Sequence, residues 1–331
     1  MMNRRAFIGS LALGTLAVPR AARAQPAGKV YRIGILGSLT PTSDMIGPQP
    51  RGPFINALLR GLRELGYVYG EHFVTETRVA ERPERLPGLA AELVRLQVDV
   101  IVAGGPSLPA LKQATSTIPV VMTGAGDPVS QGYVQSLGRP GGNFTGLSTQ
   151  TQELVGKRLE LLKELVPGPA PVGVLWDPRA DRLSWQAAES AATERRWKLI
   201  SLEIRDASQI EGALKAATAA RAGALLVFTG VVQDPHAQRI ADLAARSRLP
   251  AMYGLRFYVE AGGLIFYSTD LIAAYRRAAA FVDKILKGAK PADLPVEQPT
   301  KFDLVINLKA ARSIGLTIPQ QLLSRADEVI R

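Results

Sequence analysis

The sequence predicts an α/β fold of two doubly wound, Rossmann-like lobes joined by a three-segment hinge. Short apolar strands alternate with amphipathic helices along most of the chain, which is typical of parallel sheets with helices on both faces. The chain has 331 residues, more than one hydrophobic core usually supports. The two halves also carry similar motifs in the same order. Together these observations favour two similar lobes over one large domain.

The predicted strands are short runs rich in Val, Ile and Leu, as buried parallel strands are. Four are expected in each half, at 31–36, 73–79, 98–103 and 119–123, then at 171–176, 198–204, 224–229 and 250–253. Helices with one apolar face are expected between them, near 52–65, 84–96, 107–115, 151–165, 184–197, 207–221 and 235–247. Glycines such as Gly66 stand where a helix C-cap is needed.

Three motifs of the first half recur in the second. Y-R-I-G-I-L at 31–36 corresponds to P-V-G-V-L-W at 171–176, and D-V-I-V-A-G-G corresponds to A-L-L-V-F-T-G. S-T-I-P-V-V-M-T-G, from Ser116, corresponds to S-R-L-P-A-M-Y-G, from Ser247. One match between apolar strands is weak evidence, but three in the same order indicate an internal repeat.

Turn-forming residues indicate where the chain passes between the lobes. The segment 139–149, R-P-G-G-N-F-T-G-L-S-T, is expected to make the first crossing. The strand 263–268 and the helix 270–287 are expected to return the chain to the first lobe, and a third crossing is expected near 296–303. Three crossings form a hinge, and a hinge closes a cleft. The predicted division is lobe I at 25–146 plus 264–296 and lobe II at 147–263 plus 297–331.

The N-terminus has the pattern of a twin-arginine signal peptide at residues 1–24. Arg4 and Arg5 stand in N-R-R-A-F-I, and a stretch of apolar and small residues follows, too short to span a bilayer as a stable helix. A-R-A then predicts cleavage after Ala24. The chain contains no cysteine, so a lipid anchor on cysteine, a disulfide framework and a thiolate metal site are all excluded. We therefore expect export to the periplasm without direct membrane insertion.

The formal net charge is +11, which raises the question of nucleic-acid binding. Removal of the leader takes away four arginines, and a charge of +7 remains. The other basic residues are interleaved with glutamates, as in Lys157, Arg158 and Glu160, and no basic block with aromatic residues occurs. This pattern favours a solvated surface and no nucleic-acid partner.

In open α/β sheets the ligand lies beyond the carboxyl ends of the strands. That rule nominates residues in the loops after the predicted strands. The candidate ligand-binding residues are Ser38, Gly105, Ser107, Asp127, Trp176, Asp177, Thr229 and Tyr253.

Most of these side chains also have an ordinary structural interpretation. Ser107 can hold a carboxylate beside helix N–H groups, or it can be a helix N-cap. Asp127 and Asp177 can pair with a ligand amine, but turn formation before proline is slightly favoured. Trp176 and Tyr253 can stack on a flat ligand or fill the core. These alternatives stay open at the level of sequence.

Sequence patterns of catalytic and cofactor sites are missing. H-E-x-x-H, G-x-S-x-G and the phosphate-binding G-x-x-x-x-G-K-[S/T] do not occur. The two histidines, His72 and His236, fall in different predicted lobes. We therefore expect no catalytic residues, no metal and no cofactor, and a binding protein instead of an enzyme.

Several longer motifs together resemble the ABC transporter substrate-binding family that includes tryptophan- and tyrosine-type binding proteins. The resemblance covers nearly all of the chain after the leader. It rests on L-R-E-L-G-Y, E-R-L-P-G-L-A-A-E-L-V, T-S-T-I-P-V-V, G-D-P-V, R-P-G-G-N-F-T-G-L-S, G-K-R-L-E-L-L-K-E, V-D-K-I-L-K-G-A-K-P-A-D-L-P-V-E-Q-P-T-K-F and L-V-I-N-L-K-A-A-R-S-I-G-L. It implies a type I periplasmic-binding-protein fold and a ligand held between the lobes. It also implies an ABC permease and its ATPase as partners, and leaves the ligand open.

These observations predict a periplasmic protein that captures a small molecule, an amino acid or an aromatic carboxylate, for an ABC importer. A ligand-sensing subunit of a signalling receptor is the first alternative, and an enzyme on the same scaffold is the second. A cytoplasmic repressor of similar architecture is disfavoured, because an export signal stands where a DNA-binding segment would be.

Overall fold

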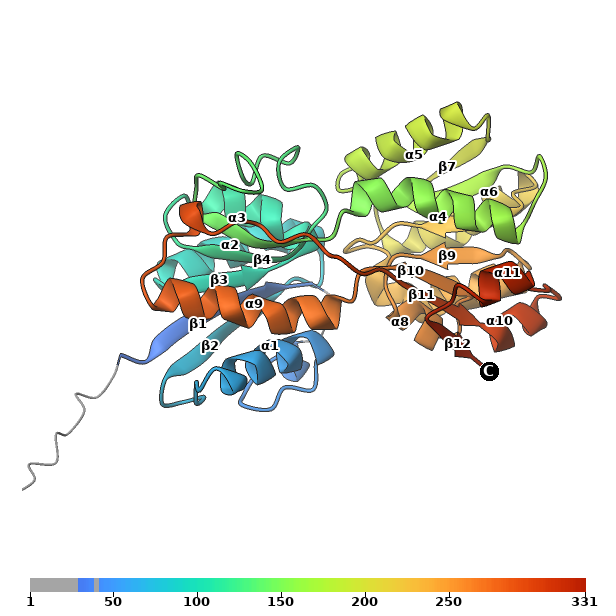
Figure 1. Ribbon diagram of the computed structural model, residues 1–331. Helices are drawn as coiled ribbons and strands as arrows, with labels where there is room; N and C mark the ends of the chain where they lie inside the picture. Colours follow the sequence, from blue (N-terminus) through green and yellow to red (C-terminus); the bar gives the residue numbers. More distant parts are fainter. Residues whose placement is uncertain (1–28, 39–41) are drawn as a thin grey trace, which may run out of the picture.

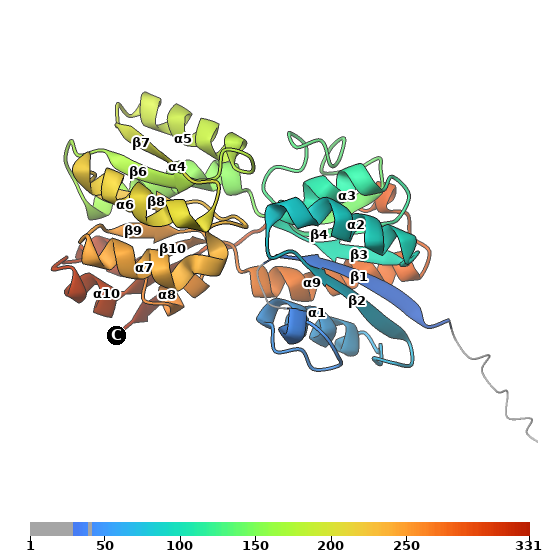
Figure 2. The same cartoon turned by 180° about the vertical axis from the view of Figure 1, so that it is seen from behind.

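The computed structural model describes residues 29–38 and 42–331, which form two α/β lobes (Figure 1). The predicted leader, its cleavage site and the predicted mature N-terminus lie outside the described residues. Each lobe is a sheet with helices on both faces, as Figure 2 shows from behind. This arrangement confirms the predicted fold class.

The first lobe contains five parallel strands in the order β2-β1-β3-β4-β5. They are β1 (Tyr31–Gly37), β2 (Phe73–Val79), β3 (Val100–Ala103), β4 (Val120–Ala125) and β5 (Phe144–Ser148). The covering helices are α1 (Pro53–Glu64), α2 (Leu86–Arg95), α3 (Leu108–Ala114) and α9 (Leu271–Leu286). Val100 and Val102 pack with α1 and α9, whereas Ile101 and Ala103 pack with α2 and α3. Successive side chains of a strand point to opposite faces, so one apolar strand serves two cores.

The second lobe contains seven strands in the order β12-β11-β10-β9-β8-β6-β7, and only the β10–β11 pair is antiparallel among those described. They are β6 (Val172–Trp176), β7 (Leu199–Glu203), β8 (Ala224–Val227), β9 (Ala251–Tyr253), β10 (Ile265–Ser268), β11 (Asp303–Asn307) and β12 (Glu328–Ile330). The helices are α4 (Thr151–Leu165), α5 (Arg182–Glu194), α6 (Ile210–Ala219), α7 (Ala237–Arg246), α8 (Phe257–Glu260), α10 (Leu308–Ser313) and α11 (Gln320–Leu323).

The two sheets repeat the same connectivity. The order β2-β1-β3-β4-β5 of the first lobe matches β7-β6-β8-β9-β10 of the second, strand for strand along the chain. The internal repeat predicted from three motifs is therefore confirmed. Strands β11 and β12 extend the second sheet beyond this repeat.

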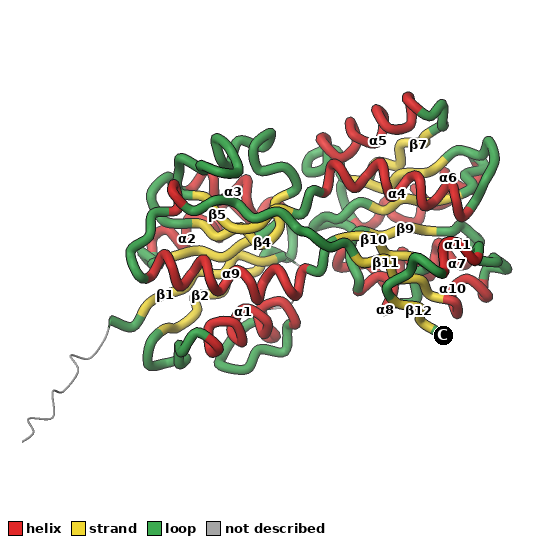
Figure 3. The backbone as a smooth tube through the Cα atoms, viewed as in Figure 1, coloured by secondary structure: helices red, strands yellow, loops and turns green. Residues whose placement is uncertain are grey.

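The three hinge segments run between the lobes in Figure 3. The chain crosses after β5, returns after β10 and crosses again before β11. Strand β10 pairs with β9 on one side and with β11 on the other, so residues 264–268 belong to the second sheet. This corrects the predicted start of the return at residue 264. Leu147 and Ser148 likewise belong to β5, and therefore to the first sheet.

The last hinge segment runs beside the first. The N–H of Glu297 donates to the Gly146 carbonyl at 2.9 Å, and the Ser148 N–H donates to the Glu297 carbonyl at 2.9 Å. These bonds pair the segment with β5 before it enters β11. The two segments are thus joined where they leave the first lobe.

No helix within residues 29–38 and 42–331 combines the length and the apolar character needed to cross a bilayer.

Candidate functional site

A cavity of about 510 Å³ lies between the lobes, and we call it the interlobe cavity. Its wall is formed by residues at or just after the carboxyl ends of β1, β3 and β4 in the first lobe and of β6, β8, β9 and β10 in the second. This is where parallel α/β sheets bind their ligands. The volume lies within the range of small-molecule sites.

Four of the predicted residues line the interlobe cavity. Ser38 and Gly105 come from the first lobe, and Asp177 and Thr229 come from the second. Each follows a strand directly or within two residues, so the strand-end rule brought together residues from opposite halves of the sequence.

Ser107 and Asp127 do not line the cavity. The Ser107 side chain is buried, and its hydroxyl has no hydrogen-bond partner among the described residues. The Asp127 carboxylate accepts from the N–H groups of Val129 and Ser130, both at 3.1 Å. Asp127 therefore has the turn-forming role that was the alternative to ligand binding.

Trp176 and Tyr253 are core residues. The Trp176 ring stacks on Trp185 with 4.9 Å between centroids, and its Nε1 donates to the Ser201 hydroxyl at 2.8 Å. The Tyr253 ring is 1% exposed and stacks on Tyr258 at 4.7 Å. Neither residue lines the cavity, and both have the core-filling role that was the alternative to stacking on a ligand.

The aromatic rings on the cavity come from other positions. Phe54, Tyr133 and Tyr275 line it, and all three belong to the first lobe. Phe54 and Tyr275 also contact each other, with 5.3 Å between ring centroids. They were not among the predicted residues, because they lie in helices and in a long loop, away from the strand ends.

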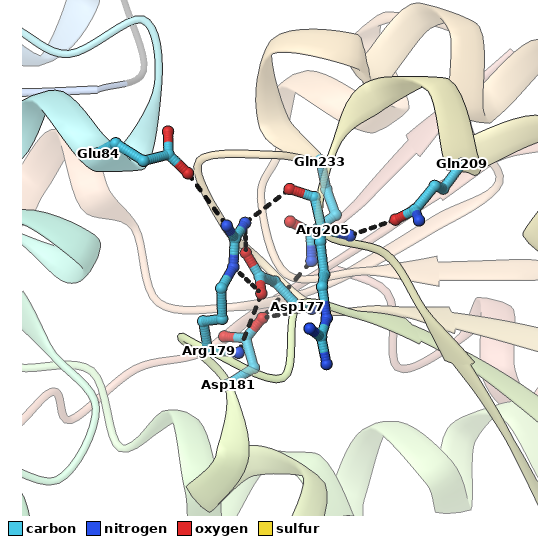
Figure 4. A network of polar contacts seen from close by, with 7 residues as sticks. All are labelled: Glu84, Asp177, Arg179, Asp181, Arg205, Gln209 and Gln233. Carbon is cyan, nitrogen blue, oxygen red and sulfur yellow. Dashed lines mark hydrogen bonds and ion pairs between the residues drawn. The ribbon is translucent and has the colours of Figure 1, made fainter.

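An ion pair joins the lobes at the cavity wall (Figure 4). Arg179 Nη1 lies 3.0 Å from Glu84 Oε1 of the first lobe. The same guanidinium donates to both oxygens of Asp177, at 2.9 and 2.7 Å, and to the Arg205 carbonyl at 2.7 Å. The Asp177 carboxylate is thus engaged by Arg179, and its role is to hold the arginine that reaches across.

Two further carboxyl groups of the second lobe, Asp181 and Asp234, line the cavity. Asp234 is buried and accepts from the Tyr258 hydroxyl and the Gly230 N–H, both at 2.9 Å. Asp181 accepts two long hydrogen bonds, from the Asp177 N–H at 3.4 Å and from Gln233 Nε2 at 3.5 Å. Burial raises the pKa of Asp181 to about 7 and raises the pKa of Asp234 well above its ordinary value. Neither carboxyl is paired with a cation among the described residues.

We expect Asp181 to make the protein less stable as the pH rises from about 4 to about 7. In that window the folded protein keeps a proton on Asp181 that the unfolded chain releases, so the free energy of unfolding falls with rising pH. The variant Asp181→Asn cannot ionise at this position. Between pH 4.5 and pH 8 its free energy of unfolding is expected to rise by roughly 1–3 kcal/mol relative to that of the wild type. Urea unfolding of both proteins at both pH values measures this difference. Equal pH dependence in the two proteins would contradict the assignment.

Arg158 of α4 is the cationic counterpart of these acids on the cavity wall. The residue is only 2% exposed, and its Nε donates to the Tyr267 carbonyl at 2.8 Å. Burial lowers the pKa of its guanidinium to about 10. From the sequence, Arg158 was expected to be one of the interleaved charges on the surface. No sequence pattern indicated that it would be buried.

The described residues contain no group of three or more His, Asp or Glu side chains arranged to hold a metal ion. Apart from the paired Glu84, Asp177 and Arg179, the cavity presents one buried cation, two carboxyl groups without a cationic partner among the described residues, and several aromatic rings. Such a set can bind a small polar or zwitterionic molecule.

Comparison with known proteins identifies the family. The family model described as ABC transporter substrate binding protein matches residues 53–330. A tyrosine-binding protein of Clostridioides difficile is 24% identical over 262 residues, which cover 78% of this chain and 75% of that protein.

Two solved structures are similar over 91% of this chain and 100% of their own chains. A conserved domain protein from Vibrio cholerae has a TM-score of 0.82 at 27% identity. An ABC domain from Streptococcus pneumoniae in complex with L-Trp has a TM-score of 0.80 at 25% identity. With the family model covering most of the sequence and the two lobes matching in fold, the chain belongs to the ABC transporter substrate-binding protein family and has the type I periplasmic-binding-protein fold.

Proposed function

We propose that this protein is the periplasmic capture subunit of an ABC importer and that its ligand is an amino acid or an aromatic carboxylate. It holds the ligand between its lobes and delivers it to a permease and its ATPase at the inner membrane. The observation that carries the proposal is the interlobe cavity, which presents buried groups of both signs between two hinged lobes.

The charges favour an amino acid over a neutral solute. Arg158 is a buried cation, and Asp181 and Asp234 are acids without a cationic partner among the described residues. An isolated charge in a low-dielectric site is costly, and a ligand that brings the opposite charges removes that cost. A zwitterion with an ammonium and a carboxylate supplies both.

The first-lobe wall favours an aromatic side chain. Phe54, Tyr133 and Tyr275 offer ring faces and edges to a ligand held by the second lobe. Two glutamines also line the cavity, Gln131 from the first lobe and Gln152 from α4 of the second, and their side-chain oxygens are buried without a partner among the described residues. They can accept from an indole N–H or a phenol O–H. The relatives named for tyrosine and crystallised with L-Trp support the same ligand class.

A thermal-shift screen of the purified mature protein against the twenty L-amino acids, aromatic carboxylic acids, sugars and polyamines tests the ligand class. A ligand at a hundred times its Kd adds about 2.7 kcal/mol of stability, which corresponds to a rise in Tm of about 4 °C for a chain of this size. We expect an aromatic amino acid to give the largest shift. A larger shift with a sugar or a polyamine would refute the ligand class, and no shift with any solute would contradict capture itself.

The leader supports the periplasmic location. Replacing Arg4 and Arg5 by lysine is expected to abolish export through the twin-arginine route, so the uncleaved precursor collects in the cytoplasm. Cell fractionation measures the location, and N-terminal sequencing of the exported wild type is expected to begin at Gln25. The matched control replaces Arg20 and Arg23 by lysine, which keeps the pair intact. Normal export of the first variant would contradict the twin-arginine assignment.

A further inference from the structure

Arg158 is a buried cation with unused donors. A guanidinium carries five N–H groups. The one on Nε donates to Tyr267, and neither Nη1 nor Nη2 has an acceptor or a carboxylate partner among the described residues. Buried arginines are normally paired, because the charge loses its hydration on burial. The lack of acceptors for the Nη1 and Nη2 groups of Arg158 therefore requires an explanation.

The surroundings of Arg158 leave its outer edge open to the interlobe cavity. Gly254, Thr229 and Ser268 line the cavity with it, at the ends of β9, β8 and β10. A Cβ atom built on Gly254 would lie 3.5 Å from both Cζ and Nη2 of Arg158. The absence of that side chain leaves room for a ligand atom to approach the guanidinium.

The Nε bond to Tyr267 also fixes the orientation of the group. A guanidinium held at Nε presents Nη1 and Nη2 in a plane, as a rigid pair of donors. This fork matches the two oxygens of a carboxylate, whereas an ammonium group offers only a point charge. The geometry therefore favours a planar anion.

We propose that Arg158 binds the carboxylate of the ligand through its two Nη groups, within the cavity wall of the second lobe. The inference rests on the proposed function, because it assigns one end of an amino-acid ligand to a named residue. Arg158, Asp181 and Asp234 all belong to the second lobe. The ligand therefore docks on the second lobe by its charged groups, and the first lobe closes over its side chain.

The first test compares acids with amides on the wild-type protein. Each L-amino acid that binds is titrated beside its C-terminal amide by isothermal titration calorimetry. The amide keeps the ammonium and the side chain and loses the anion. We expect the amide to bind about a hundredfold more weakly, as when one partner of a buried charge pair is removed.

The second test repeats both titrations on Arg158→Gln. The glutamine amide can still donate to the Tyr267 carbonyl, but it carries no charge. We expect the preference for acid over amide to fall below about fivefold, since the preferred charge partner is gone. Arg325→Gln is the matched control, because Arg325 is a surface arginine of the same lobe, paired with Glu164 outside the cavity. It is expected to keep the full preference.

The outcomes distinguish binding of the ligand carboxylate by Arg158 from a purely structural role of this residue. If Arg158 only supports β10, Arg158→Gln lowers the affinities for the acid and for the amide equally. The preference for acid over amide then survives, and this result would overturn the proposal. Equal binding of acid and amide by the wild type would overturn it as well. If Arg158→Gln does not fold, Arg158→Lys, which keeps the charge without the fork, is expected to retain only about a tenth of the preference. Failure of amino acids and aromatic carboxylates alike to bind would refute the proposed function. An unchanged preference for acid over amide in the variants would refute only the role of Arg158 in binding the carboxylate.

Discussion

Replacing Gly146 with alanine is expected to lower the free energy of unfolding by about 3 kcal/mol or more. Gly146 lies in β5 with φ +125°, in a region that favours glycine. A Cβ atom there would lie 2.3 Å from the Met122 carbonyl oxygen and 2.6 Å from the Met122 N, both backbone atoms of the paired strand β4. Backbone cannot move aside as a flexible side chain can, so β5 must shift. The Gly146 carbonyl also holds the last hinge segment through Glu297.

Urea unfolding measures the effect on Gly146→Ala. The matched control is Gly212→Ala in α6, where a Cβ atom meets nothing within 4 Å. That variant is expected to be more stable than the wild type by about 0.5–1 kcal/mol, because alanine is the better helix former. Equal stability of the two variants would contradict the close contact in β5.

Replacing Arg179 with methionine is expected to lower both the stability and the ligand affinity. The Asp177 carboxylate is 3% exposed, and Arg179 supplies two of its hydrogen bonds. When the Arg179 guanidinium is lost, the buried Asp177 carboxylate keeps one donor, the backbone N–H of residue 179 at 3.0 Å. We expect a cost of about 2 kcal/mol in the free energy of unfolding. We also expect an affinity about tenfold lower, because the bridge from Arg179 to Glu84, which joins the two lobes, is lost.

The variant Glu84→Gln separates these two effects. It removes only the bridge between the lobes and leaves the Asp177–Arg179 pair intact. The Glu84 side chain is 64% exposed, so the change in stability is expected to stay within about 0.5 kcal/mol. Urea unfolding and ligand titration at low and high salt compare the variants. If Glu84→Gln destabilises the protein as much as Arg179→Met, the buried carboxylate is not the cause.

The sequence predicted the repeated part of the fold because each element carries a local pattern. Strands such as β3 are uninterrupted apolar runs, and their length and flanking residues identify them. Strand β10 was assigned to the wrong lobe, since pairing partners are not visible in a local pattern. A signal was nevertheless present: G-G-L-I-F-Y-S before and within β10 resembles G-G-N-F-T-G-L-S before and within β5. That match would have made β10 the fifth strand of the second repeat.

The candidate site was predicted only where it lies directly after strands. Thr229 and Asp177 follow β8 and β6, and topology alone brings them to the cavity. Arg158 comes from the middle of α4, beside residues that are partly exposed, and its burial depends on how that helix packs on the sheet. Trp176 ends a strand, but its ring points into the helix layer and meets Trp185 of α5. Side-chain direction at a strand end is therefore decided by packing, which a strand-end rule does not include.

The return of the chain to the first lobe has a consequence for biosynthesis. Helix α9 covers the face of the first sheet that α1 also covers, and Phe281 and Val282 contribute to that core. Most of the second lobe must emerge from the ribosome before α9 does. Until then the nascent first lobe exposes apolar surface that its own residues cannot cover. We therefore expect the N-terminal half to rely on chaperones during translation, and the halves to acquire their final structure late and together.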